Sequence, residues 1–419
     1  MMDIQKEARK LREYLVALRR DFHQHPELSM QEHRTARRIE EELDKLGIFH
    51  TRSAGTGVIG WIRGEGPDTA PQREGEDASQ SPVGTAFSSR RGQDRVVALR
   101  ADIDALPITE PSDREYVSQN PGVMHACGHD LHNTALLGAA RILMEHRDLF
   151  AGRVKLIFQT GEEIGEGAQE MVAAGEMEGV ERIFGLHAAP DLRKGEAGIR
   201  TGINNASVDH FKIEIQGKST HVSTPHLGVD AAYIAAQIVT ALQALVTRTT
   251  SPVDPVVIGV GVMQAGTSYN IVAGEGMLEG TTRATSQATR EDIQRKVTAT
   301  AQSIAKIYGG RARVIWKDVA SALVNDPRAA QEARESTEEI IGRDHVISNR
   351  PISLGGDNFA EFLVKVPGVY VYLGTSNEML PNTLRQIHNE GFDVDEEALE
   401  IGAALYASYG LKWLRGDYK

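Results

Sequence analysis

The sequence predicts an α/β protein in which a discontinuous first domain carries an inserted α+β domain. The chain has 419 residues, enough for two or three domains at ~100 to 200 residues each. Strand-like and helix-like segments alternate from residue 96 to residue 186 and again after residue 327, which is typical of a largely parallel sheet. Between residues 207 and 318 the pattern changes to period-two strands and long helices.

The composition is that of a soluble folded chain. Hydrophobic residues make up 41% and charged residues 25%, close to globular averages. The 46 basic and 58 acidic residues give a net charge of −12, so no basic field attracts phosphate backbones or anionic lipid. The first residues lack the apolar core of a secretory signal, and no run of ~18 apolar residues predicts a membrane span. We therefore expect a cytoplasmic protein without a nucleic-acid or membrane partner.

The N-terminal third is expected to begin with helices. Apolar residues at helical spacing predict two helices within residues 3–47, separated at His25-Pro26. Residues 64–94 are rich in Gly, Ser, Pro, Glu and Arg, which indicates a long mobile surface loop within the first domain. Short apolar runs predict strands on either side of it, at 57–62 and 95–100.

The remaining elements set the domain boundaries. In the first domain we expect strands at 96–99, 154–159, 182–186 and 370–373, and helices at 131–144, 168–174, 327–341 and 396–415. In the insertion we expect strands at 208–216, 256–264, 276–283 and 312–316, and helices at 230–246 and 290–308. Residues 1–206 and 319–419 are therefore assigned to one α/β domain, and residues 207–318 to the inserted domain.

The only cysteine of the chain lies in a candidate metal site. Cys127 cannot form an intramolecular disulfide, and it stands two residues before His129 at the start of an apolar helix. A thiolate and an imidazole at this spacing can both bind a metal ion. A buried inert cysteine beside a structural histidine is the alternative when the pair is considered alone.

Further polar residues follow predicted strands of the same domain. Glu162 and Glu163 come directly after the strand that ends at Gln159, His187 follows the next strand, and His388 lies in a loop after the C-terminal one. Parallel strands bring their carboxyl ends to one edge of a sheet, where α/β proteins place functional groups. One carboxylate can bind metal while its neighbour acts as a general base.

Six motifs together resemble one family. They are RRDFHQHPE (19–27), LRADIDALP (99–107), MHACGHD (124–130), QTGEE (159–163), GKSTH (217–221) and GTTR (280–283). In this order the chain is similar to the M20 metallopeptidase family, specifically its aminoacylase-like amidohydrolase branch. That branch includes N-acyl-amino-acid, hippurate and auxin-conjugate hydrolases. The resemblance implies a zinc-peptidase-like catalytic domain with an inserted lid and dimerisation domain.

The resemblance also implies a dinuclear metal site with a defined ligand set. Cys127 matches a bridging thiolate, and Glu162 matches the general base. Asp104 either orients the site from behind the ligands or simply ends a strand. The two divalent ions are expected to be zinc or manganese, with cobalt and nickel as alternatives. The remaining ligand positions are matched by His129, Glu163, His187 and His388.

In the inserted domain the resemblance assigns three further residues. His221 is expected to reach the active site of the partner subunit in a homodimer formed through the lid, and to stabilise the tetrahedral oxyanion. Asn270 and Arg283 match positions that hold the free carboxylate of the substrate. Higher oligomers are compatible with this arrangement.

The predicted reaction is hydrolysis of an N-acyl amino acid to a carboxylic acid and a free amino acid. A metallo-carboxypeptidase or dipeptidase is the alternative within the same chemistry. A cysteine amidase that uses Cys127 with His129 is a second class, and it lacks an obvious orienting third group. A non-catalytic binding protein ranks low because the ligands and Glu162 are all present. The acyl group and the amino acid cannot be deduced from the sequence.

Overall fold

The structure, a computed structural model, describes residues 2–67, 95–111 and 114–418. Most of the predicted loop at 64–94 lies outside these residues. The chain divides into two compact units. Unit 1 comprises Met1–Asn204, Val324–Pro351 and Asn358–Lys419, and unit 2 comprises Asn205–Leu323 and Ile352–Asp357. The boundaries predicted from the sequence, 206/207 and 318/319, lie near these positions, but the prediction assigned the short segment Ile352–Asp357 to the first domain.

Unit 1 is built on a mixed sheet with helices on both faces. In the described part of the chain the sheet has eight strands in the order β1-β2-β4-β3-β5-β14-β6-β13. These strands are β1 (Phe49–Ser53), β2 (Gly57–Arg63), β3 (Val96–Asp102), β4 (Arg153–Gln159), β5 (Arg182–Arg193), β6 (Ala197–Gly198), β13 (Val346–Ile347) and β14 (Gly368–Ser376). The helices are α1 (Ile4–Lys10), α2 (Arg12–Gln24), α3 (His33–Lys45), α4 (His129–Glu145), α5 (Gly167–Ala173), α8 (Pro327–Ile341), α9 (Phe359–Leu363) and α10 (Glu397–Arg415).

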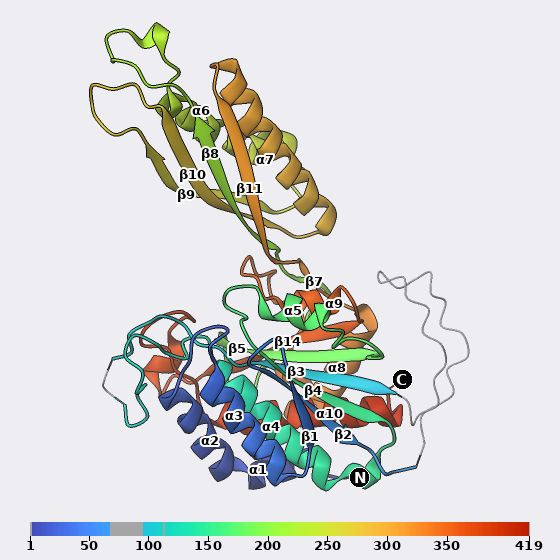
Figure 1. Cartoon of the computed structure of the whole chain (residues 1–419). Helices are drawn as coiled ribbons and strands as arrows, with labels where there is room; N and C mark the ends of the chain where they lie inside the picture. The colour runs from blue at the N-terminus through green and yellow to red at the C-terminus, as the bar shows by residue number, and fades with distance from the viewer. Residues whose placement is uncertain (1, 68–94, 112–113, 419) are drawn as a thin grey trace. The chain divides into compact units, whose positions relative to one another are not determined.

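The centre of this sheet is parallel and buried. β4, β3, β5 and β14 run parallel to one another, and every residue of β3 and β14 is buried. Helices α4 and α10 pack together on one face, while α5 and α9 lie on the opposite face (Figure 1). Strands covered on both faces favour apolar sequence, and most residues of these four strands are apolar. The parallel arrangement places the ends of β3 and β4 side by side, since Asp102 pairs with Gln159.

Unit 2 is a separate α+β layer. Its antiparallel sheet has the order β11-β8-β10-β9, with α6 (Ala231–Ala244) and α7 (Gln287–Ile307) packed against it. The strands are β8 (Val208–Gln216), β9 (Val256–Ala265), β10 (Glu275–Ala284) and β11 (Arg311–Ala320). Alternate residues of β8 are buried, so its inward side chains form the core with both helices. Outside both main sheets, β7 (Gly202–Asn205) pairs with β12 (Leu323–Asn325).

One described segment of unit 2, Ala231–Thr249, is long and apolar enough to cross a membrane by length and composition alone. A core helix of a folded domain passes the same test. Here Ile234, Ile238 and Leu242 are fully buried in the core of unit 2. The apolar character of the segment is therefore explained by its packing.

The predicted fold class is confirmed, and two local predictions need correction. Residues 3–47 form three helices rather than two, because the chain breaks at Leu11 between α1 and α2. The strand β1 was not predicted, because its residues are mostly exposed and its apolar pattern is weak. It is held by antiparallel pairing with β2.

Candidate metal centre

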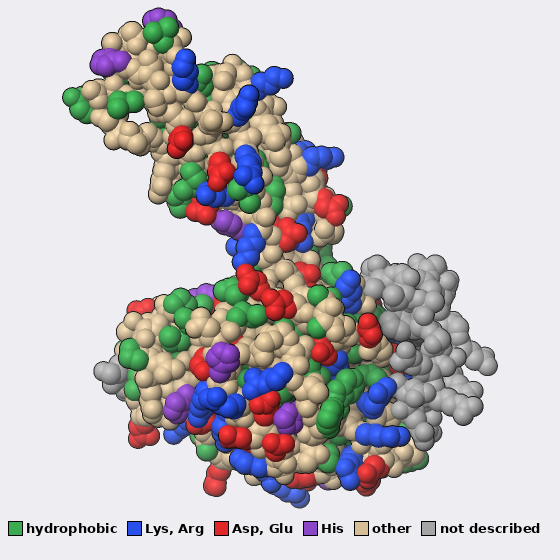
Figure 2. Space-filling model, in the orientation of Figure 1, with side chains coloured by type: hydrophobic (Ala, Val, Ile, Leu, Met, Phe, Trp, Pro, Cys, Tyr) green, Lys and Arg blue, Asp and Glu red, His purple; other side chains and the backbone are tan. Residues whose placement is uncertain are grey.

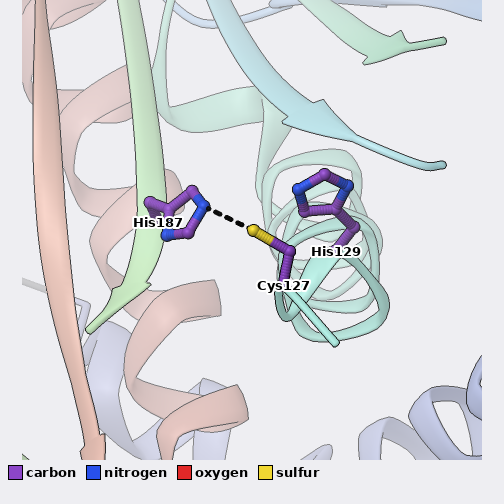
Figure 3. Close-up of side chains that lie close together, drawn as sticks. All are labelled: Cys127, His129 and His187. Carbon is purple, nitrogen blue, oxygen red and sulfur yellow. Dashed lines mark hydrogen bonds between the residues drawn. The ribbon is translucent and has the colours of Figure 1, made fainter. Parts of the chain in front are cut away.

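Two groups of potential metal ligands share one thiol at the edge of the unit 1 sheet. Cys127, His129 and His187 form one group, and Cys127, Glu163 and His388 form the other. Within each group the ligand atoms lie within 4.8 Å of one another. Figure 3 shows Cys127 and His129 at the start of α4 facing His187 on β5, with Cys127 Sγ 3.4 Å from His187 Nε2. The structure therefore brings all five predicted ligands together.

The backbone at these ligands adopts conformations that serve the site. Gly128 has a φ of +91°, and a Cβ at this position would lie 2.8 Å from the Cβ of Ala188, next to His187. Only glycine fits this position without strain. His388 has a φ of +64°, which is uncommon for a residue with a side chain. Its N–H donates to the carbonyl of Ala126 at 2.7 Å, which ties its loop to the Cys127 segment.

Two histidines present the same nitrogen to the centre. His129 Nδ1 lies 2.9 Å from the carbonyl oxygen of Asp104, and His187 Nδ1 lies 2.7 Å from that of Ala188. A carbonyl only accepts, so each Nδ1 carries the proton and each Nε2 keeps its lone pair. Metal-binding histidines are usually oriented by such hydrogen bonds.

The residues present fit a pair of divalent cations. His129 Nε2 and Glu163 Oε1 are buried, and neither has a hydrogen-bond partner in the described part of the chain. Burial raises the pKa of Cys127 well above its usual value, and the carboxylate of Glu163 raises it further. A cation would satisfy the two orphaned atoms and stabilise the thiolate. Imidazole, thiolate and carboxylate are suitable ligands for zinc and its neighbouring transition metals.

The same geometry disfavours the cysteine-amidase alternative. The nucleophile of such an enzyme is a thiolate, which is favoured at exposed electropositive positions. Cys127 is 5% exposed, and the pKa of its thiol is raised by burial and by Glu163. Without a cation, Cys127 is therefore a poor nucleophile.

Asp104 contacts one residue from each of the two ligand groups. Its carboxylate accepts hydrogen bonds from Ser29 Oγ at 2.6 Å and from the N–H of Glu163 at 3.0 Å. Its other oxygen, Oδ1, lies 3.3 Å from His129 Nδ1. Burial raises the pKa of Asp104, but the hydrogen bonds from His129, Ser29 and the Glu163 N–H outweigh burial and leave the pKa lowered. Asp104 is thus placed to orient one ligand from each group.

The supporting residues Asp102 and His132 were not among the site residues predicted from the sequence. His132 Nδ1 donates to Asp102 Oδ1 at 2.6 Å, and its Nε2 accepts from the N–H of Ala188 at 2.8 Å. Both nitrogens are occupied, so His132 supports the His187 segment rather than binding metal. A useful sequence signal was the position of His132, one helical turn after His129.

Glu162 lies beside the proposed ligands without belonging to the two groups that share Cys127. Its carboxylate comes within 4.8 Å of ligand atoms of His129 and Glu163. Glu162 Oε1 accepts a hydrogen bond from the backbone N–H of Asn358 at 3.2 Å. The structure therefore places a second carboxylate next to the candidate metal ligands.

In unit 2 the structure brings two of the three predicted residues together. His221 pairs with Ile271 in an isolated bridge, and the carbonyl of Asn270 accepts from the N–H of Val222 at 3.1 Å. Figure 2 shows histidine and hydrophobic side chains gathered at a loop end of this unit. The exposed hydrophobic residues of these loops are Val222, Leu227, Tyr269 and Ile271.

Arg283 lies apart from that pair. Asn270 precedes the first residue of β10, whereas Arg283 is near the last. At ~3.3 Å per residue, a strand of this length separates the two positions by roughly 25 Å. Burial lowers the pKa of Arg283, and its Nη1 donates to the carbonyl of Thr282 at 3.0 Å. A single unit 2 cannot therefore present Asn270 and Arg283 to the same small carboxylate.

Residues 98–412 match peptidase family M20/M25/M40. The chain belongs to this family. Thermostable carboxypeptidase 2 of Saccharolobus solfataricus is 35% identical, with 98% of each chain covered. N-acetylcysteine deacetylase of Bacillus subtilis is also 35% identical, with 94% of this chain and 95% of the relative covered.

A solved structure of an M20 family member gives information about the number of metal ions. A dinuclear metal-binding peptidase from Bacillus subtilis aligns with a TM-score of 0.79 and 32% identity, covering 97% of this chain and 99% of that one. The two ligand groups that share Cys127 agree with a dinuclear site. As an M20 family member, the chain is a metal-dependent hydrolase that acts on amide or peptide bonds.

Proposed function

We propose that this M20 hydrolase cleaves the amide bond of N-acyl amino acids, releasing a carboxylic acid and a free amino acid. The main observation is the pair of ligand groups that share Cys127, with a further carboxylate, Glu162, beside them. The relative named N-acetylcysteine deacetylase supports this substrate class.

The proposed ligand assignment follows the two groups. Cys127, His129 and His187 would hold one cation, and Cys127, Glu163 and His388 would hold the other. Zinc or manganese is proposed, with cobalt or nickel as alternatives, since the ligand set suits all of them. Two bound cations would polarise the amide carbonyl and make water a nucleophile near neutral pH. Their charge exceeds that of the thiolate and Glu163, so the centre stays positive.

Glu162 is proposed as the proton carrier. Its carboxylate would take a proton from the attacking water and return it to the nitrogen of the leaving amino acid. One residue would thus act first as the base and then as the acid. The backbone N–H of Asn358 donates to Glu162 Oε1 and orients this carboxylate beside the proposed ligands.

Unit 2 is proposed to complete the site in a homodimer. His221 and Asn270 lie together, while Arg283 lies near the far end of β10. One small substrate can meet both ends of that strand only if two copies of unit 2 contribute. We infer that His221 and Asn270 come from one subunit and Arg283 from the other. His221 would stabilise the oxyanion, while Asn270 and Arg283 would bind the substrate carboxylate.

We also propose that the protein is cytoplasmic. The basis is its one cysteine, which is free and buried, as expected in a reducing compartment.

A carboxypeptidase or dipeptidase activity is the second candidate. It is favoured by the relative named thermostable carboxypeptidase 2, which matches at the same identity as the deacetylase. Both activities cleave an amide next to a free carboxylate, so the residues described so far serve either one. The difference lies in whether the group on the other side is a simple acyl chain or an amino acid.

A substrate panel distinguishes these activities. Amino-acid release is measured from N-acetyl, N-benzoyl and longer N-acyl amino acids and from dipeptides, before and after chelation and with zinc or manganese restored. We expect chelator-reversible release from acyl conjugates at a higher kcat/KM than from dipeptides. Faster dipeptide cleavage would replace the proposed function by the second candidate, and absence of release from both classes would refute both.

A further inference from the structure

A series of hydrogen bonds between buried side chains connects strand β3 to Glu162. Arg100 Nη1 donates to Asp102 Oδ2, and Arg100 Nε donates to Gln159 Oε1, both at 2.7 Å. Gln159 Nε2 then donates to Asn358 Oδ1 at 2.7 Å. The N–H of Asn358 donates to Glu162 Oε1 at 3.2 Å. We call Arg100, Gln159 and Asn358 the relay.

The direction of every hydrogen bond in the relay is fixed by its first residue. Arginine is a permanent donor and cannot accept. Gln159 must therefore turn its oxygen toward Arg100 and its amide nitrogen toward Asn358. Asn358 must in turn present its oxygen to Gln159. Neither amide can flip without placing two donors or two acceptors against each other. The guanidinium of Arg100 therefore sets the orientation of the Asn358 side chain through Gln159.

The relay is also held rigidly. Arg100 and Gln159 are fully buried, and Asn358 is 1% exposed. The guanidinium of Arg100 lies 5.5 Å from the ring centroid of Phe359, so the arginine contacts the residue that follows Asn358 as well. Buried side chains that are fixed by hydrogen bonds and packing lose little precision through motion. The backbone N–H that contacts Glu162 is therefore fixed from two directions.

We propose that Gln159 and Asn358 are positioning residues that hold the carboxylate of Glu162 in the orientation needed for proton transfer. This inference rests on the proposed function, because it requires Glu162 to be the base. The side chain of Asn358 acts through its oxygen, which anchors the backbone donor. Its Nδ2 is buried and has no hydrogen-bond partner in the described part of the chain, so the amide nitrogen contributes no contact to the relay.

The test uses Asn358→Leu, which keeps the size of the side chain and removes its acceptor, and Asn358→Asp, which keeps an acceptor. Asn358→Leu should lower kcat by about 10- to 100-fold, the usual range for residues that orient a metal site's reacting groups. KM and the metal content per subunit should stay unchanged. Asn358→Asp should recover most of the lost kcat because Gln159 Nε2 keeps its partner.

A double-mutant cycle with Glu162→Gln separates positioning from structural damage. If the relay acts only through Glu162, adding Asn358→Leu to Glu162→Gln should lower single-turnover rates no further. Asn325→Leu is the matched control. Asn325 is a fully buried asparagine whose side chain bonds to the backbone of Tyr370 and Arg200. It should lower stability while leaving kcat per folded molecule unchanged.

Each outcome decides between the hypotheses. Wild-type kcat in Asn358→Leu, or a full additional loss in the Glu162→Gln background, would overturn the relay. Wild-type kcat in Glu162→Gln would instead overturn the proposed base, whatever Asn358→Leu does. If Asn358→Leu does not fold, Gln159→Met breaks the same link from the other side and is held to the same criteria.

Discussion

We expect the backbone conformation of Gly128 to determine how tightly the protein binds metal. Gly128→Ala adds one methyl group between two proposed ligands, Cys127 and His129. The residue has a φ of +91°, and the new Cβ would lie 2.8 Å from the Cβ of Ala188. Ala188 follows His187, so relief of this contact must displace either the segment of Cys127 and His129 or that of a third proposed ligand, His187.

The expected loss of stability has two parts. A side chain in the left-handed region costs about 1–2 kcal/mol. Overpacking a well-filled interior costs about 1–3 kcal/mol more. The free energy of unfolding of unit 1 should therefore fall by about 2–5 kcal/mol, the sum of the two ranges. Displacement of His187 should also weaken metal binding by about 10- to 100-fold.

Gly195→Ala is the matched control, because Gly195 has a similar φ of +87° and nothing within 4 Å of a new Cβ. It should lose only the backbone cost of about 1–2 kcal/mol and keep wild-type metal affinity. Denaturant unfolding is followed by tryptophan fluorescence in a Trp316→Phe background, so that the remaining tryptophans, Trp61 and Trp413, report on unit 1. Equal losses of stability and of metal affinity in the two variants would show that the contact with Ala188 does not determine metal binding.

Three further predictions follow from the described contacts. Arg19 is buried against Asp130 and Asp393 at 2.7 and 2.8 Å, so Arg19→Met should cost about 3–5 kcal/mol in denaturant unfolding by removing the guanidinium that both carboxylates contact. Burial raises the pKa of both carboxylates, but Arg19 and the other partners of each carboxylate outweigh burial and leave both pKa values lowered. The contribution of the two carboxylates to the free energy of unfolding should therefore hold above pH ~4 and decline below it in the wild type. A flat profile below pH ~4 would contradict the assignment. Glu32 accepts hydrogen bonds from the loop that leads to Glu162, so Glu32→Gln should lower kcat about 10-fold or more. Glu332→Gln, which changes a buried glutamate paired with Arg182, should lower only stability. Removal of the metal should lower the thermal midpoint and its return should restore it, since ligands that bind the folded state stabilise it; an unchanged midpoint would argue against a site formed by folding.

Much of the fold could be predicted because its signals are local. The helix at 327–341 and the strand at 208–216 coincide with α8 and β8, since each has a clean period and clear end signals. The five proposed ligands could be named because they follow strands or begin a helix in recognisable motifs. Their gathering at one sheet edge follows from parallel topology.

The relay could not be predicted because it depends on tertiary contacts. Gln159 and Asn358 are 199 positions apart, and no period or spacing joins them. The two charged residues of the buried strand β3 were a missed signal, since Arg100 and Asp102 interrupt an otherwise apolar run. A charge in a strand covered on both faces requires partners. Identifying those partners required the structure.

We propose that the thiolate of Cys127 would bind both of two cations on which hydrolysis depends. Metal-free protein is titrated with Co²⁺ while bound metal, thiolate-to-cobalt absorption and amino-acid release are followed together. We expect two ions per chain, thiolate absorption from the first addition, and turnover that reaches its maximum as the second ion binds. Cys127→Ala should lose the absorption and most of the turnover. Saturation at one ion, or full activity without the thiolate signal, would contradict the claim.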